Sequence, residues 1–373
     1  MKAKKLTAAL LTGAMVFTMA ACGSKPSTST PSTSKPSTST PSTSTPSTSA
    51  PAPAASYDSL DAVELIAGDA TGKGAAGQIF GQLVASKVEE ITGGKLTIDY
   101  HPNSELGGDV DLLRQVQSGD LDIVVCQTAP MVSFIPEMAV FDLPMVFSKY
   151  DADTIDKVLN GSDSEFHNQL AAAYEKAGYH QLGFLQNGTY RLTTANTALN
   201  TLADFQGLQI RTMENKNHMD FWTAIGASPT PLAWPEVYIS LQNGTIDAQE
   251  NAADTCATSN FHEVQKYLAC TNHILYNNQI CINAESYNNL DPLYQQALDQ
   301  AVSEAIAEMR PQLEQIDVDN KAKLEEGGMT IINYEASFYD EILNLDGVKA
   351  LYSSIDSQIG GLGTTLQAAL DAA

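Results

Sequence analysis

The stretch Asp109-Val-Asp-Leu-Leu-Arg-Gln-Val-Gln-Ser-Gly-Asp-Leu-Asp-Ile-Val-Val-Cys126 carries the pattern that decides the fold. Residues 109–117 place apolar side chains at helical spacing, and Gly119 ends the predicted helix. Residues 121–126 then form a run of strand length that is apolar apart from Asp122. A helix that leads through a glycine into a fully buried strand is typical of an α/β fold with a largely parallel sheet.

The same alternation occurs on both sides of this stretch. Residues 75–91 have an amphipathic helical pattern ended by two glycines, and residues 95–100 alternate like a strand. A second helix-to-strand unit, Val237-Tyr-Ile-Ser-Leu-Gln-Asn-Gly-Thr-Ile-Asp247, resembles residues 113–122. Ligands of open α/β sheets bind beyond the carboxyl ends of the strands, so two such units predict two lobes facing a cleft.

The C-terminal part is predicted to be helical. A long helical pattern covers residues 292–326, with Pro311 as an interruption, and a final helical region covers residues 353–372. The folded body begins near residue 57, and its length suits two domains at about 100–200 residues each.

The N-terminus has the features of an export signal. A lysine-rich segment, residues 2–5, precedes a short apolar run at residues 6–19, which is too short for a stable membrane-spanning helix. Met19-Ala-Ala-Cys22 follows. We expect a lipoprotein in which the signal peptide, residues 1–21, is removed and Cys22 is lipid-modified. The alternative is an ordinary signal peptide whose removal leaves Cys22 as a free thiol.

Residues 22–56 are predicted to form a lipid-anchored linker. The segment is almost wholly Ser, Thr and Pro, so it has nothing to bury and stays extended and solvated. At roughly 3 Å per residue, such a segment holds the body up to roughly 100 Å from the membrane.

The charge of the chain limits the partners that it can have. The formal net charge is −24, which argues against nucleic acid and anionic surfaces as partners. No later stretch approaches 18 apolar residues, and we expect the body to be soluble and a monomer.

Neither cysteines nor catalytic motifs indicate reaction chemistry. Four cysteines beyond residue 22 lack metal-ligand spacing, and we expect them to be small buried hydrophobes, with a bridge between Cys270 and Cys281 as the alternative. The chain has no G-x-S-x-G, Walker or G-x-G-x-x-G motif, and Lys266 spoils an H-E-x-x-H pattern that starts at His262. We therefore expect no metal, no cofactor and no enzyme activity.

Arginine is the most informative residue type because the chain has so few. Arg114 and Arg310 lie on predicted helices among other charges and are interpreted as surface residues. Arg211 ends the apolar strand at residues 208–211, and Arg191 lies in a short strand. A guanidinium at a strand end suits bidentate capture of a carboxylate. The alternative is a structural ion pair with one of the 44 acidic residues.

Two further residues are candidates for the walls of a site. Trp234 lies between prolines in a loop before a helix, where it either lines a pocket or packs in the core. Asn251 follows the second helix-to-strand unit and can donate a hydrogen bond to a carboxylate or hydroxyl group.

At these residues the chain resembles the solute-binding proteins of TRAP transporters, the dicarboxylate- and sialic-acid-binding family. The resemblance spans nearly all of residues 62–290. Its most specific stretches are Tyr100-His-Pro-Asn-Ser-Glu-Leu-Gly, residues 113–122, Phe141-Asp-Leu-Pro, Asp204-Phe-Gln-Gly-Leu-Gln-Ile-Arg211, Gly226-Ala-Ser-Pro-Thr-Pro, Glu236-Val-Tyr, Gln249-Glu-Asn251 and Phe261-His-Glu-Val-Gln-Lys-Tyr.

The resemblance implies two α/β lobes joined by crossing strands and a long helix, a periplasmic-binding-protein-like fold that closes on its ligand. It places the family's principal carboxylate-binding arginine on Arg211 and a second cleft arginine on Arg191, with one extra residue, Tyr190, in that alignment. The aromatic wall falls on Trp234, and the cleft asparagine falls on Asn251.

Two positions depart from the sialic-acid binders. Gln127 stands where those proteins have a cleft glutamate, and Asp69 stands where they have an asparagine. Both residues remain candidate ligand contacts. The departures count against sialic acid and leave a dicarboxylate or a sugar acid as the ligand.

We therefore expect a solute-binding lipoprotein that delivers an organic acid to TRAP membrane permease subunits. Lobe I is expected to comprise residues 57–185 plus 277–315, and lobe II residues 186–276 plus 316–373. A sensor lipoprotein that feeds a receptor is the alternative, and a secreted hydrolase is a weaker one.

Overall fold

The computed structural model describes residues 56–373 apart from residue 187. The predicted signal peptide 1–21, the lipidation site Cys22 and the linker up to residue 55 lie outside the described residues.

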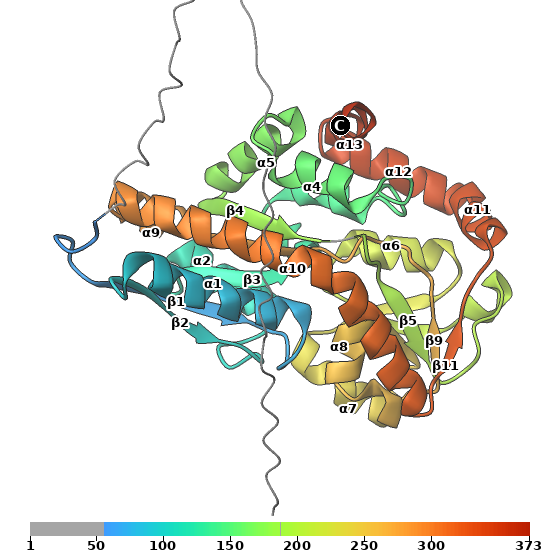
Figure 1. The fold of residues 1–373 in the computed structure, drawn as a ribbon. Helices are drawn as coiled ribbons and strands as arrows, with labels where there is room; N and C mark the ends of the chain where they lie inside the picture. Colours follow the sequence, from blue (N-terminus) through green and yellow to red (C-terminus); the bar gives the residue numbers. More distant parts are fainter. Residues whose placement is uncertain (1–55, 187) are drawn as a thin grey trace, which may run out of the picture. The chain divides into compact units, whose positions relative to one another are not determined.

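The first sheet has the strand order β2-β1-β3-β10-β4, and we call the body around it lobe I (Figure 1). Its strands are β1 (Val63–Asp69), β2 (Leu96–His101), β3 (Ile123–Gln127), β4 (Tyr179–Leu185) and β10 (Asn278–Asn283). Strand β1 is parallel to β2 and β3, whereas β10 is antiparallel to β3 and β4. The strands β3 and β10 are buried along their whole length, and for β3 the apolar run within residues 121–126 predicts this burial.

The second sheet has the order β11-β9-β5-β8-β6-β7, and we call the body around it lobe II. Its strands are β5 (Leu192–Ala195), β6 (Gln209–Thr212), β7 (Ser228–Pro231), β8 (Ala248–Asn251), β9 (Tyr267–Ala269) and β11 (Thr330–Ile332). Strand β8 lies between β5, to which it is antiparallel, and β6, to which it is parallel.

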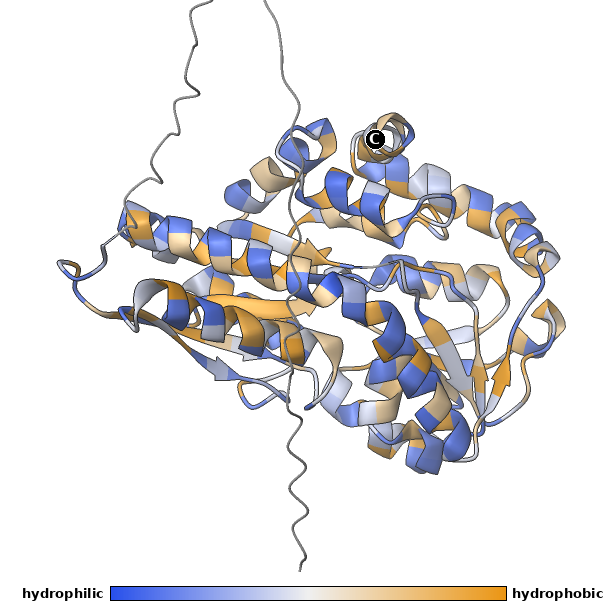
Figure 2. Ribbon diagram, in the orientation of Figure 1, coloured by the Kyte–Doolittle hydropathy of each residue, from blue (hydrophilic) through white to orange (hydrophobic). Residues whose placement is uncertain are grey.

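Helices cover both sheets. They are α1 (Ala76–Thr92), α2 (Asp109–Ser118), α3 (Thr128–Met131), α4 (Ala152–Asn160), α5 (Glu165–Lys176), α6 (Lys216–Ala224), α7 (Val237–Gln242), α8 (Ala253–Thr258), α9 (Ala284–Asn289), α10 (Pro292–Glu326), α11 (Ala336–Asn344), α12 (Asp346–Gln358) and α13 (Leu362–Ala372), with short 3-10 turns η1 (Pro136–Asp142), η2 (Leu202–Phe205), η3 (Trp234–Glu236) and η4 (Phe261–Glu263). Figure 2 shows the apolar colour concentrated on the strands and on the helix faces turned toward them.

Three connections join the lobes. The segments that lead from β4 to β5 and from β9 to β10 cross side by side, where Arg191 N donates to Ile274 O at 2.8 Å and Tyr276 N to Thr189 O at 2.8 Å. The third connection is α10, which packs against α1 and β4 of lobe I and against α8 of lobe II. The predicted long helix is therefore present and spans both lobes.

The predicted α/β class is confirmed, with three differences in detail. Both sheets are mixed and not largely parallel, because strands that return from the other lobe, such as β10, enter antiparallel to their neighbours. Helix α10 continues through Pro311 and changes direction near its middle in Figure 1, as a proline inside a helix bends it. The final helical region consists of α12 and α13, separated at Gly360 and Gly361, which both have positive φ.

Buried apolar side chains of the described residues form one cluster in each lobe and a third that is continuous across both. Phe80 of α1 belongs to the lobe I cluster, and Leu268 of β9 belongs to the lobe II cluster. Phe184 of β4 and Trp222 of α6 share the third. No helix in the described part of the chain is both long and apolar enough to cross a bilayer.

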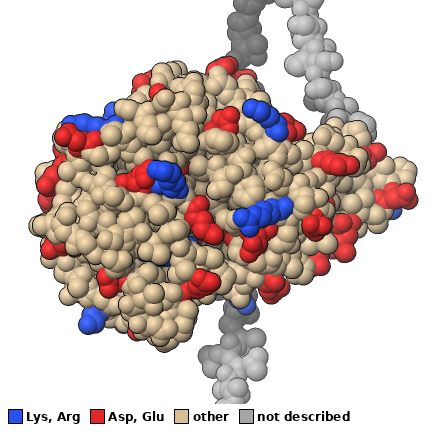
Figure 3. All heavy atoms as spheres, turned by 180° about the vertical axis from the view of Figure 1, so that it is seen from behind, with Lys and Arg blue, Asp and Glu red and all other residues tan. Residues whose placement is uncertain are grey.

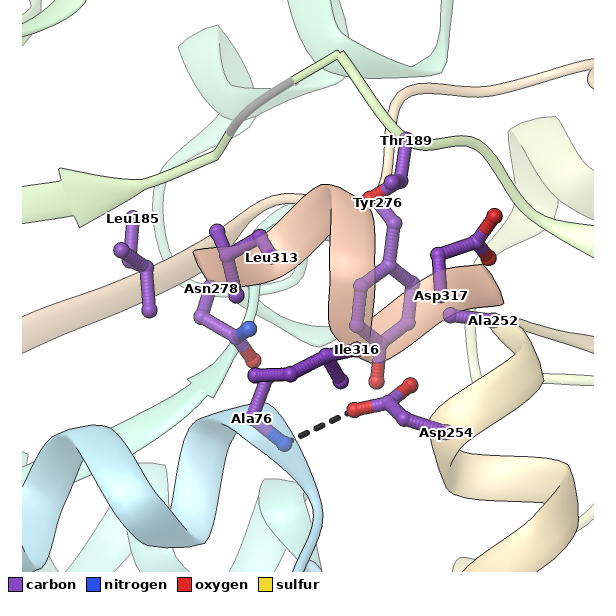
Figure 4. Close-up of a pocket in the computed structure, with 10 residues that line it drawn as sticks. All are labelled: Ala76, Leu185, Thr189, Ala252, Asp254, Tyr276, Asn278, Leu313, Ile316 and Asp317. Atoms are coloured by element: carbon purple, nitrogen blue, oxygen red, sulfur yellow. Dashed lines mark hydrogen bonds between the residues drawn. The ribbon is translucent and has the colours of Figure 1, made fainter. Parts of the chain in front are cut away.

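A carboxylate from lobe II caps the first helix of lobe I. Ala75 precedes α1 and provides no side-chain cap, but the buried Asp254 of α8 accepts a hydrogen bond from Ala76 N at 2.7 Å (Figure 4). The contact lies beside a cavity of about 20 Å³ that Tyr276 and Asn278 also line. A negative group at a helix N-terminus is favourable, although burial raises the pKa of Asp254.

We expect Asp254→Ala to lower the free energy of unfolding by about 1–3 kcal/mol, because Ala76 N is then a buried donor without a partner. Asp254→Asn should cost clearly less, since its amide oxygen can still accept this bond and a neutral group is easier to bury. Urea unfolding of the two variants measures the difference. Equal losses in both variants would contradict a role for Asp254 as a hydrogen-bond acceptor.

Candidate ligand-binding site

The candidate residues of lobe II lie on adjacent strands at one end of the second sheet. Leu192 of β5 is opposite Asn251 in β8, and Arg211 of β6 is opposite Gln249 in β8. Arg191 directly precedes β5. Because β5 is antiparallel to β8, the start of β5 and the carboxyl end of β8 meet. The strand register thus brings both arginines and Asn251 to the same place.

Arg211 is almost completely buried, with 2 % of its surface exposed. Its Nε donates to Leu232 O at 2.8 Å, and the guanidinium lies over the ring of Trp234, with 5.7 Å between Cζ and the ring centroid. Among the described residues no carboxylate lies within ion-pair distance of it, and the buried Nη1 has no hydrogen-bond partner. Burial lowers the pKa of Arg211 to about 10, so the group is charged at neutral pH.

Trp234 lies against this guanidinium, and Asn251 ends the neighbouring strand β8. The ring of Trp234 also packs against Phe261 at 5.8 Å, so the residue both lines the site and contacts the core of lobe II. The buried side chain of Asn251 makes no hydrogen bond to any part of the chain that the structure describes. A pocket of about 230 Å³ between the lobes is lined by Ala70, Ser104 and Trp234.

Arg191 has a different environment from Arg211. Its Nε and Nη2 donate to the carboxylate of Glu250, and Nη2 also donates to Glu250 O at 2.9 Å. Arg191 and Glu250 are both buried. This is the structural ion pair that the sequence left open as the alternative. Only Nη1 points elsewhere, toward Gln127 Oε1 at 3.4 Å.

Glu250 is the centre of a buried network that extends into lobe I. His273 Nε2 lies 3.2 Å from its Oε2, and His218 Nδ1 lies 3.4 Å from its Oε1. His218 Nε2 lies 3.1 Å from Asp142 Oδ1 of lobe I. Burial opposes the charged form of Glu250, yet Arg191 and the two histidines hold its pKa well below the usual range. Nothing in the sequence pattern identified this network.

We expect Glu250→Gln to lower the free energy of unfolding by about 3–5 kcal/mol, because it leaves the buried charge of Arg191 without its counter-ion. Asp220→Asn provides the control, since Asp220 pairs with Lys216 on the exposed face of α6. Asp220→Asn should lower the free energy of unfolding by less than about 0.5 kcal/mol. Chemical denaturation compares the two, and equal effects would contradict the ion-pair interpretation.

The network also predicts a pH dependence of stability. Burial opposes the charged form of His218, but hydrogen bonds to Asp142 and Glu250 raise its pKa from 6.5 to about 9. The stabilisation is complete below pH 6.5 and is lost as the pH rises through 9, on the order of 3 kcal/mol in total.

Urea unfolding between pH 6 and pH 9.5 should show this decline, and His218→Gln should flatten it. The same substitution at His262, which lies outside the network, should leave the decline in place. A wild-type profile that is flat over this range would contradict a charged His218.

Lobe I contributes Asp69 and Gln127, which end the adjacent strands β1 and β3. Asp69 accepts hydrogen bonds from Thr71 N at 2.7 Å and from the hydroxyl of Tyr100 at 2.8 Å. Burial raises its pKa to about 6, although these bonds oppose the shift. Gln127 Nε2 donates to Asn278 Oδ1 at 2.6 Å, so Gln127 links β10 to Arg191.

The structure adds one acidic residue that sequence reasoning missed. Asp109 is the first residue of α2, is partly buried, and makes no hydrogen bond or ion pair with the described residues. Burial raises its pKa to about 7, with a further rise from Asp69 and an opposing effect from Arg211. Gly107 and Gly108 directly precede it, and this part of the sequence gave no sign of where the carboxyl group of Asp109 lies.

The remaining chemistry of the chain is sparse. Cys126, Cys256, Cys270 and Cys281 are free and buried, which agrees with the expectation of small hydrophobes and not with the bridge. In the part of the chain that the structure describes, no group of His, Cys, Asp and Glu is arranged to hold a metal ion.

Comparison with known proteins agrees with this geometry. The family described as bacterial extracellular solute-binding protein, family 7, matches residues 74–342. The sialic acid-binding periplasmic protein SiaP of Vibrio cholerae is 33% identical over 222 residues, which cover 59% of this chain and 67% of that protein. The 2,3-diketo-L-gulonate-binding periplasmic protein YiaO of Escherichia coli is 31% identical over 252 residues, covering 68% and 75%.

A solved structure is similar over almost its whole length. The TRAP periplasmic solute-binding protein of Polaromonas, bound to D-erythronate, has a TM-score of 0.74 and 26% identity, and the match covers 82% of this chain and 98% of that one. The chain therefore belongs to bacterial extracellular solute-binding protein family 7, the family of TRAP transporter solute-binding proteins, as the resemblance predicted. It acts outside the cytoplasm in solute binding for a TRAP-type transporter.

Proposed function

We propose that the protein captures a small organic acid by pairing the ligand's carboxylate with Arg211. The supporting observation is that Arg211 is buried and charged while its Nη1 has no partner. A buried charged donor without a partner is costly, and an incoming carboxylate would remove this cost. Asn251 is the second donor, and Trp234 packs on the apolar side of the ligand.

The surface of the protein supports local recognition of the anion. Figure 3 shows Asp and Glu spread over the face, with Lys and Arg in the minority, as the net charge of −24 requires. Such a surface does not attract anions over long distances. The affinity for an acid therefore depends on the few cationic groups inside the cleft, and nucleic acid is not a partner.

Arg191 has a supporting role in this proposal. Its ion pair with Glu250 leaves one nitrogen for the site, so it adds positive charge and holds Gln127 in place. Asp69 and Gln127 form the lobe I wall. Relatives named for sialic acid, 2,3-diketo-L-gulonate and C4-dicarboxylates, and a structure with D-erythronate, support a small organic acid as the ligand.

The proposal includes delivery without catalysis. Ligand binding shifts the lobes toward the closed form, which presents the acid to TRAP permease subunits supplied by other chains. The lobes are residues 57–185 plus 277–315 and 186–276 plus 316–373. The strand content of each sheet supports this division, although α13 packs against α4 and α5 of lobe I (Figure 1). Lipidation of Cys22 anchors the monomeric protein to the membrane.

Arg211→Lys should weaken binding of the acid roughly 10- to 100-fold, because loss of a charge-assisted hydrogen bond costs about 1.5–3 kcal/mol. A thermal-shift screen with D-erythronate, D-galactonate and succinate selects the acid, and calorimetry measures its affinity. The matched control is Arg114→Lys, the same change at an exposed position of α2. Unchanged affinity in Arg211→Lys would refute the proposed carboxylate site.

A further inference from the structure

We propose that Asp109, together with Asp69, makes the site selective for acids that carry one carboxylate and several hydroxyl groups, and that it excludes dicarboxylates. This inference rests on the proposed function, because it takes Arg211 as the group that holds the ligand's carboxylate.

The fold brings Asp109 of lobe I near Arg211 of lobe II, close enough for each charge to affect the ionisation of the other. A Cβ at Gly108, the residue before Asp109, would lie 3.8 Å from Pro235 Cδ, so the start of α2 meets the loop of lobe II that carries Trp234. Trp234 is the residue whose ring lies against the Arg211 guanidinium. On the other side, Ala70 follows Asp69 and lines the same pocket as Trp234. Asp69 and Asp109 are therefore each adjacent in sequence to a residue at the border of this pocket, and Arg211 lies against the Trp234 ring that lines it.

Asp109 differs from its neighbour in the same helical turn. The side chain of Asp111 is 64% exposed and lies 3.7 Å from Arg114 at the surface. Asp109 is partly buried and has no partner among the described residues. Asp69, by contrast, has Thr71 and Tyr100 as donors, so Asp109 is the carboxyl group with its oxygens available to a ligand.

The charged groups around Asp109 come from several elements. Asp69 of β1 and Glu214, which follows β6, oppose its ionisation, whereas Arg211 of β6 and Arg191 favour it. Two of these four groups, Asp69 and Glu214, are thus acidic, and Asp69 belongs to lobe I like Asp109. Burial together with Asp69 raises the pKa of Asp109 to about 7, so its charge changes within an accessible pH range.

The carboxyl groups of Asp69 and Asp109 distinguish ligands by the charge at the end far from Arg211. A ligand whose carboxylate is on Arg211 presents its far end to lobe I. A hydroxyl group there can donate to Asp109, and it gains a charge-assisted hydrogen bond. A second carboxylate meets like charges in a site of low dielectric, where repulsion is strong, and it can bind only if Asp109 takes up a proton.

D-Galactonate and galactarate test this selectivity, because the CH2OH group of galactonate is replaced by a second carboxylate in galactarate. Both acids stay ionised above pH 6. Calorimetry with the wild-type protein should show galactonate binding at least about tenfold tighter at pH 8. The affinity for galactarate should rise as the pH falls to 6, by up to about tenfold per pH unit above the pKa of Asp109.

Asp109→Asn should bring the affinities for the two acids closer together. It should also remove the pH dependence of the affinity for galactarate. Asp111→Asn removes the same charge from the same turn of α2 and should behave as wild type. The wild-type pH series needs no variant, so the test holds even if Asp109→Asn does not fold.

Equal affinities of the wild-type protein for the two acids at pH 8 would overturn the proposed selectivity. The same holds if the ratio of the two affinities is unchanged in Asp109→Asn. Binding of succinate but neither sugar acid, if it depends on Arg211, would also overturn it and leave the proposed function standing. If none of these acids binds, the proposed function fails and the selectivity fails with it.

Discussion

The structure of the candidate site depends on how the charges of two buried guanidinium groups, those of Arg191 and Arg211, are compensated. A buried charge is costly unless it is paired, and the two arginines meet this constraint in different ways. Arg191 is neutralised inside the protein by Glu250. Arg211 is left with a hydrogen bond to a backbone carbonyl, the face of Trp234 and an unpaired nitrogen. The first arginine is part of the internal structure of the protein, and we propose that the second pairs with an external anion.

The surrounding fold makes this difference possible. The strand register in the second sheet fixes Arg191, Asn251 and Arg211 at one end of three neighbouring strands. The Glu250 network reaches Asp142 of lobe I through His218, so it ties the lobes together as well as neutralising Arg191. Asp254 adds a second polar contact between the lobes at the start of α1. Both contacts are buried, and both lie beside the residues expected to bind the ligand.

Acidic residues have a different role at the candidate site from the one that they have at the surface. At the surface, carboxylates are solvated and mainly keep the protein soluble. Asp69 is buried and Asp109 is partly buried, and burial raises the pKa of both. Both carboxyl groups interact electrostatically with each other, and Asp109 also with Arg211, which is the basis of the proposed selectivity against dicarboxylates.

The sequence by itself determined the alternation of helices and strands, the long C-terminal helix and the strand-end positions of Arg211 and Asn251. Periodicity and glycine stops encode these features locally. Only the tertiary structure decided the partner of each charge. Glu250 is 59 residues from Arg191, and Asp142 is 76 residues from His218, so no local pattern links them. The same limit hid Asp109, because a helix N-terminus in the sequence does not show which charges the opposite lobe brings near it.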